Sequence, residues 1–107
     1  MRGPPAHLTI GAAAEHIAAA ALLEDKWWVA AMRVVGPFDF VAIRGRGKTL
    51  EVRLIDVKVV APSARAKQRS QTQQLLGVQL VYVDLESGGV ATTVGRARRG
   101  EKTKILD

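Results

Sequence analysis

Hydrophobic and polar positions along the chain change from a helical to an alternating pattern. Residues 9–25 are dominated by alanine, a strong helix former, and predict a single helix. Its small side chains should let it pack closely against a sheet. Residues 1–8 contain Gly3, Pro4 and Pro5, which oppose regular structure, so we expect a loose arm there.

Strand-like segments follow the first helix and are separated by turn residues. Gly36 and Pro37 end the first strand, and a basic turn of hairpin length, residues 45–48, separates the second from the third. Gly77 ends a polar second helix that opens at Pro62 and Ser63. The predicted strands cover residues 27–35, 38–44, 49–60, 78–85 and 90–94, and the second helix runs to residue 76.

This order of elements predicts an α/β fold with a mixed central sheet flanked by helices. Three consecutive strands favour an antiparallel meander, whereas the helix before the fourth strand allows that strand to join in parallel. The sequence shows no repeat and no internal boundary. We therefore expect one domain over residues 1–107, with residues 96–107 as a basic tail.

Charge favours a polyanionic partner, such as nucleic acid or an anionic membrane surface, because the formal net charge is +6. An inert basic surface is the alternative. The chain has no cysteine, which excludes disulfides, and two histidines, which argue against a His-rich zinc centre. No apolar run would span a membrane, and we expect no signal peptide and a cytoplasmic location.

Two neighbouring strands carry carboxylates on otherwise apolar sides. Asp56 and Lys58 follow Leu54 on one side of the third strand, where a salt bridge at the sheet rim is the structural alternative to catalysis. Asp39 interrupts an apolar side of the second strand. Adjacent strands lie about 5 Å apart, so Asp39 and Asp56 could meet. Such a pair of hard oxygen ligands suits Mg²⁺ or Mn²⁺.

Glu15 is a third candidate carboxylate. It lies in the middle of the first helix among alanines. It either marks the exposed boundary of that helix or joins the other two carboxylates. The adjacent Trp27 and Trp28 should divide, one into the core and the other at an interface or against a base.

Three motifs together resemble the PD-(D/E)XK nuclease superfamily: Gly11-x-x-x-Glu15, Pro37-Phe38-Asp39 and Asp56-Val57-Lys58. The layout is similar to small archaeal Holliday-junction resolvases and to endonucleases encoded in group I introns. The resemblance covers residues 9–85 and implies a restriction-endonuclease-like core. It also implies an Mg²⁺-dependent DNA endonuclease that hydrolyses phosphodiester bonds, with Mn²⁺ able to substitute.

The resemblance implies a role for each of these residues. Asp39, Asp56 and the backbone carbonyl of Val57 would hold the metal, and Glu15 would bind the metal or a water molecule on it. Lys58 would orient or activate the attacking water and offset charge on the scissile phosphate. There are departures: the proline stands two residues before Asp39, and many relatives carry glutamate at the position of Asp56.

Partners and substrate follow from softer features. A lone small domain that cuts both strands would need two copies, so we expect a homodimer. Junction, flap, duplex end and sequence-specific site stay open as substrates. A non-catalytic nuclease-fold module for DNA binding or assembly is the alternative, and an RNA-associated basic domain is a third. One glutamine of the second helix could support the site. The expected DNA-binding residues are Arg46, Lys48, Arg65, Lys67, Arg69, Gln71, Arg96, Arg98 and Arg99.

Overall fold

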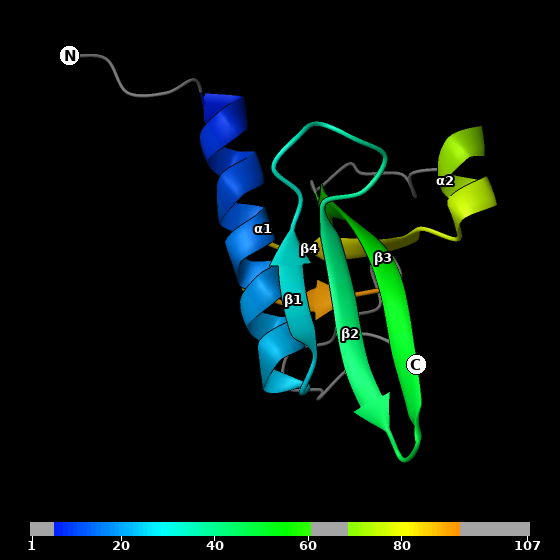
Figure 1. Ribbon diagram of the computed structural model, residues 1–107. Helices are drawn as coiled ribbons and strands as arrows, with labels where there is room; N and C mark the ends of the chain where they lie inside the picture. Colours follow the sequence, from blue (N-terminus) through cyan, green and yellow to red (C-terminus); the bar gives the residue numbers. More distant parts are fainter. Residues whose placement is uncertain (1–5, 61–68, 93–107) are drawn as a thin grey trace.

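The computed structural model describes residues 6–60 and 69–92, and within them it has two helices and a five-stranded sheet (Figure 1). The predicted α/β class and mixed sheet are confirmed. No helix in this part of the chain is long and apolar enough to cross a membrane. In chain order the elements are α1 (Ala6–Glu24), β1 (Trp28–Ala31), β2 (Phe40–Arg46), β3 (Thr49–Val59), α2 (Gln71–Leu76), β4 (Gln79–Val83) and β5 (Val90–Ala91).

The strands lie in the sheet in the same order as in the chain. β1, β2 and β3 form the predicted antiparallel meander. β4 joins β3 in parallel, after the connection that contains α2, and β5 pairs antiparallel with β4. A parallel pair needs such a crossover, and the helix before the fourth strand supplies it, as the sequence allowed.

Helix α1 covers one face of this sheet (Figure 1). Ala14, Ala18 and Leu22 recur every four residues, so they line one side of the helix, and all three are buried. They form a core cluster with strand residues that include Ile55 and Val81. Two alanines at the centre of the contact allow the close approach that the sequence predicted.

The end of α1 is fixed by a left-handed residue that is not glycine. Lys26 has a φ of 70°, and its N–H donates to the Leu23 carbonyl at 3.1 Å. The N–H of Trp27 donates to the Leu22 carbonyl at 2.9 Å. This pair of bonds is a Schellman motif, and the buried side chains of Trp27 and Leu22 supply its hydrophobic contact.

Several predicted boundaries were wrong. α1 begins at Ala6, so residues 6–8 are helical rather than part of a loose arm. β1 ends at Ala31 instead of residue 35. The Met32 N–H still donates to the Asp39 carbonyl at 2.9 Å, which continues the β1–β2 register by one pair before the chain leaves the sheet. The resulting connection, residues 32–39, brings the chain back to β2.

The predicted second helix was also too long at its start. Arg69 and Ser70 are not helical, because the Ser70 side chain caps the backbone of Gln73 and so starts α2 at Gln71. Residues 61–68, which the prediction also made helical, lie outside the described residues. β5 is described for Val90–Ala91.

Candidate active site

The two carboxylates that the sequence singled out lie together where β2 begins. The N–H of Asp39 donates to the Ile55 carbonyl at 2.7 Å, which places Asp39 directly before β2 and beside β3. Asp56 follows Ile55 on β3. The carboxyl groups of Asp39 and Asp56 lie close enough for Asp56 to raise the pKa of Asp39. The expected meeting of the two side chains is therefore present.

Asp39 is held by the backbone of the neighbouring strand. Its Oδ2 accepts a hydrogen bond from the Val57 N–H at 2.7 Å. The pKa of Asp39 is raised from 3.8 to about 6, mainly by burial, and the charges of Asp56 and Glu15 contribute to the increase. The hydrogen bond from the Val57 N–H opposes it. An ionised Asp39 is thus disfavoured unless a cation compensates for it.

Asp56 is the charged side chain that is most deeply buried among the described residues, with a residue exposure of 8%. Its Oδ2 accepts from Nε2 of Gln73 at 2.8 Å and pairs with Nζ of Lys58 at 3.0 Å. A buried carboxylate is tolerated when such partners replace water. These two contacts therefore replace water around the buried side chain of Asp56.

Lys58 lies two residues beyond Asp56 on the same side of β3. Its ion pair with Asp56 is the structural alternative named from the sequence, and it is present. The Lys58 side chain is nevertheless 36% exposed, against 11% for Asp56. Its ammonium group therefore stands between a buried carboxylate and solvent, where it can meet a bound phosphate.

Gln73 is the described glutamine whose side chain contacts Asp56. Its Oε1 accepts from the Ser70 N–H at 3.0 Å, and its Nε2 donates to Asp56 and to the Pro37 carbonyl, both at 2.8 Å. Both ends of the amide are used, so its orientation follows from its partners. Sequence analysis left the glutamine undetermined, although Ser70-x-x-Gln73 has the spacing of a capping box.

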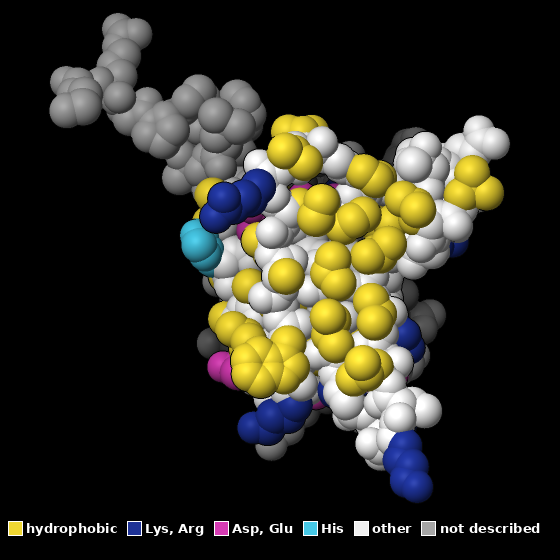
Figure 2. All heavy atoms as spheres, in the orientation of Figure 1, with side chains coloured by type: hydrophobic (Ala, Val, Ile, Leu, Met, Phe, Trp, Pro, Cys, Tyr) yellow, Lys and Arg dark blue, Asp and Glu magenta, His cyan; other side chains and the backbone are white. Residues whose placement is uncertain are grey.

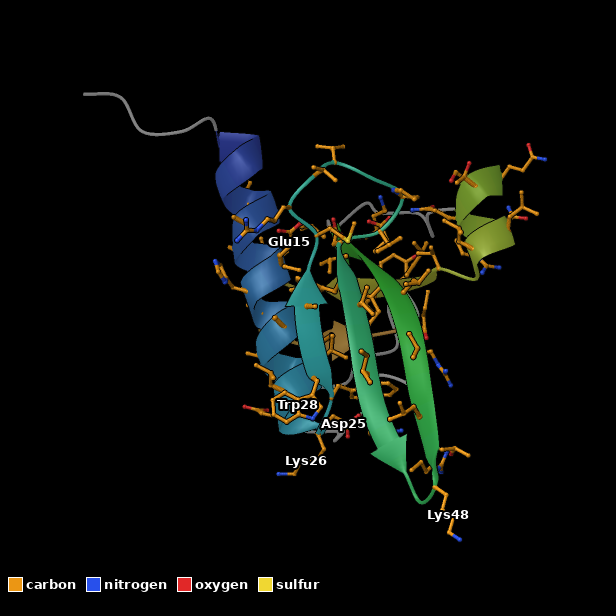
Figure 3. The ribbon with its side chains drawn as sticks, viewed as in Figure 1. Glu15, Asp25, Lys26, Trp28 and Lys48 are labelled. Carbon is orange, nitrogen blue, oxygen red and sulfur yellow. The ribbon has the colours of Figure 1, made fainter. Side chains whose placement is uncertain are left out.

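Glu15 lies on α1 beside the connection between β1 and β2 (Figure 3). It is close enough for its charge to raise the pKa of Asp39. Within residues 6–60 and 69–92, however, no three acidic or histidine side chains converge closely enough to hold a metal ion together. Glu15 is thus a neighbour of the Asp39–Asp56 pair rather than a member of a ready ligand set.

The oxygen ligands at this position suit a hard divalent cation. The Val57 N–H contacts Oδ2 of Asp39, and Gln73 and Lys58 both contact Oδ2 of Asp56. None of these three contacts uses the Oδ1 atom of either carboxylate. The Val57 amide faces Asp39, and the carbonyl of a strand residue points toward the same neighbouring strand as its amide. Two carboxylates and a carbonyl suit Mg²⁺, which keeps several waters in its shell.

The predicted phosphate-binding residues are divided between distant places. Arg46 and Lys48 lie at the hairpin between β2 and β3, six residues of strand away from Ile55, which is about 20 Å. Figure 3 shows Lys48 and Glu15 toward opposite ends of the molecule. Arg46 also pairs with Glu51 at 3.6 Å. The structure does not bring these two cations to the carboxylates.

Arg69 and Gln71 lie at the start of α2, closer in the chain to Gln73. Arg69 donates to the Val78 carbonyl at 3.2 Å. With Arg53 and Tyr82 it lines an open cavity of about 840 Å³. The remaining expected DNA-binding residues, Arg65, Lys67, Arg96, Arg98 and Arg99, lie outside the described residues.

Comparisons with known proteins give no relative for this chain. A scan of family models and searches of curated proteins and of solved structures found no match. The chemistry of the site therefore has to be argued from its own residues.

Proposed function

We propose that this chain is an Mg²⁺-dependent DNA endonuclease of the PD-(D/E)XK type, with a restriction-endonuclease-like core. The observation that carries the proposal is the pair of carboxylates from adjacent strands, Asp39 and Asp56, with Lys58 beside them. Their mutual repulsion destabilises the protein unless a cation or a proton lies nearby. Mg²⁺ at the pair would remove that repulsion and create a hydrolytic centre.

Each residue has a task in this proposal. Asp39, Asp56 and the Val57 carbonyl would hold Mg²⁺, or Mn²⁺ in its place, which supplies charge neutralisation and lowers the pKa of water. Lys58 borders solvent, so it can orient the attacking water and stabilise charge on the phosphate. Gln73 fixes the orientation of Asp56.

Glu15 and the net charge support the same proposal from outside the pair. Glu15 is near enough for its charge to act on Asp39, and in this proposal it would bind the metal or a water molecule on it. The formal net charge of +6 favours association with a polyanion. Structure-specific substrates such as DNA junctions are the form of DNA that we propose first.

A non-catalytic nuclease-fold module is the second candidate. It is favoured by the ion pair at 3.0 Å between Lys58 and Asp56, which already compensates for one carboxylate. The absence of a third converging carboxylate among the described residues points the same way. In this case Lys58 would be structural, and the chain would bind DNA or assemble with other subunits without cutting.

A cleavage panel tests the proposal. Four-way junction, duplex DNA, single-stranded DNA and RNA are incubated with the chain in Mg²⁺, in Mn²⁺ and in a chelator, beside the Asp56→Asn variant. The proposal expects DNA cleavage that needs the metal and falls about a hundredfold or more in the variant. DNA binding without cleavage on any substrate would favour the non-catalytic module, and cleavage of RNA alone would assign a ribonuclease.

A further inference from the structure

The face of the sheet opposite α1 exposes a continuous group of hydrophobic side chains. They come from three neighbouring strands, and the register aligns Trp28 with Ile43 and Ile43 with Val52. Figure 2 shows hydrophobic side chains across β1, β2 and β3 and onward to α2. We call this group the apolar face, and it consists of Trp28, Val41, Ile43, Leu50, Val52 and Leu54.

Several members of the apolar face are more exposed than a half-buried sheet requires. Trp28 is 77% exposed, Leu50 74% and Val52 52%. On α2, Leu75 and Leu76 are 82% and 46% exposed. Scattered exposed hydrophobic residues are ordinary in proteins, but a contiguous group aligned across three strands is typical of an interaction surface.

We propose that a second copy of this chain covers the apolar face. The exposed parts of Trp28, Leu50 and Val52 and of the two leucines on α2 amount to apolar surface on the order of 400 Å². In homodimer interfaces about 65% of the buried area is apolar, and a standard interface buries about 800 Å² on each partner. The partly buried members of the face supply much of the remainder, so the area suits a modest dimer.

Shape and charge favour a copy over other partners. Two sheets pack face to face about 10 Å apart with their strands nearly aligned, and a twofold axis makes one such face complementary to itself. None of the six side chains of the apolar face is charged. Two copies, each with a net charge of +6, can therefore meet there without burying like charges, whereas DNA would find no cation.

The apolar face adjoins the candidate site but does not depend on it. Leu54 and Asp56 lie on the same side of β3, two residues apart, which is about 7 Å. A covering subunit would therefore border the carboxylates. The inference rests on the exposure, register, area and charge of the apolar face, and none of these involves the carboxylates, so it stands or falls separately from the nuclease proposal.

Molecular mass as a function of concentration tests the dimer. Sedimentation equilibrium on the full chain should show a rise from 11.5 kDa toward twice that mass. The Val52→Lys variant places a charge at the centre of the face, and in a twofold dimer it does so twice. It should raise the dimer dissociation constant about a hundredfold or more.

Leu23→Lys is the matched control, because Leu23 is 54% exposed on α1, nearly the same as Val52. It should dimerise as the wild type does. A thermal melt of each variant separates loss of the dimer from loss of the fold. The proposal is overturned if the wild type stays at 11.5 kDa at the highest attainable concentration. It is also overturned if folded Val52→Lys dimerises as tightly as Leu23→Lys.

Discussion

At the scale of single residues, Asp39 is subject to opposing influences. The Val57 N–H stabilises its charged form, while burial and the charges of Asp56 and Glu15 stabilise its neutral form. The second group of effects is larger, since the pKa rises from 3.8 to about 6. At neutral pH the metal-free protein therefore carries a carboxylate that its surroundings disfavour.

The stability of the metal-free protein should decrease as Asp39 ionises. Its folded pKa is above its unfolded value, so its stabilising effect is complete below pH 3.8 and is lost as the pH rises through about 6. Asp39→Asn still accepts the Val57 hydrogen bond and removes the titration. As the pH rises across this range, the melting temperature should fall more for the wild type than for the variant.

Added Mg²⁺ provides the control for this titration. At neutral pH it should raise the melting temperature of the wild type, because binding to the native state stabilises it, and should have less effect on Asp39→Asn. If the melting temperatures of the two proteins changed with pH in the same way, the pKa of Asp39 would not be raised in the folded protein.

Replacing Lys58 distinguishes a structural role for this residue from a catalytic one. Asp56 keeps its hydrogen bond from Gln73 when the ammonium is removed, so Lys58→Met should fold with little loss of stability. If the proposed function is correct, Mg²⁺-dependent cleavage should fall about a hundredfold or more. Lys26→Met is the control, since Lys26 is exposed at the end of α1 and is not among the expected DNA-binding residues.

The measurements for Lys58 are a thermal melt and a cleavage time course on each variant. A Lys58→Met protein that melts far below the wild type, yet cleaves at the wild-type rate when folded, would remove Lys58 from the proposed mechanism. It would leave the ion pair with Asp56 as the role of this residue.

At the scale of elements, the two described helices end with different residue types that adopt the same backbone conformation. Lys26 and Gly77 both adopt left-handed backbone, with φ values of 70°. Glycine adopts this conformation without steric cost, whereas a side chain there costs about 1 kcal/mol or more. The end of α1 therefore stores a small destabilisation that the end of α2 avoids.

Substitutions at these two helix ends should change the stability of the protein in opposite directions. Lys26→Gly should stabilise the protein by about 1 kcal/mol, and Gly77→Ala should destabilise it by a similar amount. In a domain of this size that is about 4–8 °C in melting temperature. A lower melting temperature for Lys26→Gly would mean that the lysine side chain stabilises the native state more than its backbone strains it.

The hairpin between β2 and β3 should contribute to DNA binding without affecting catalysis. Arg46 and Lys48 are exposed there, about 20 Å from the carboxylates. Replacing both with alanine should weaken binding and lower the slope of log affinity against log salt by up to about two. The cleavage rate at saturating DNA should not change. Identical salt slopes would exclude the hairpin from the DNA interface.

The sequence predicted the elements better than their ends. The antiparallel meander followed from the turn positions, the possibility of a parallel fourth strand from the second helix, and the meeting of Asp39 with Asp56 from alternation along the strands. The early end of β1 was not predicted, because residues 32–35 contain no glycine or proline before Gly36. Gln73 was missed because its contact with Asp56 joins residues 17 positions apart, which local pattern does not encode.

At the scale of the whole molecule, the sheet divides two chemically different sides. α1 covers one side with small side chains, while the other side carries the apolar face and, beyond Leu54, the candidate site. A hydrophobic content of 48% is enough for the chain to form a core, but it does not say which hydrophobic residues remain outside it. Both Val52 and Ile55 are β-branched strand residues, and only their side of β3 distinguishes them.

The adjacent tryptophans illustrate this division and provide two optical probes. Trp27 is buried, with the Arg44 guanidinium 4.2 Å from its ring centre, whereas Trp28 is exposed on the opposite side. Trp27 should emit at shorter wavelength and resist quenching by iodide, while Trp28 should emit as in water and be quenched. Unfolding would change the emission of Trp27, whereas a partner that covers the sheet would change the emission of Trp28. One fluorescence spectrum can therefore distinguish the two events.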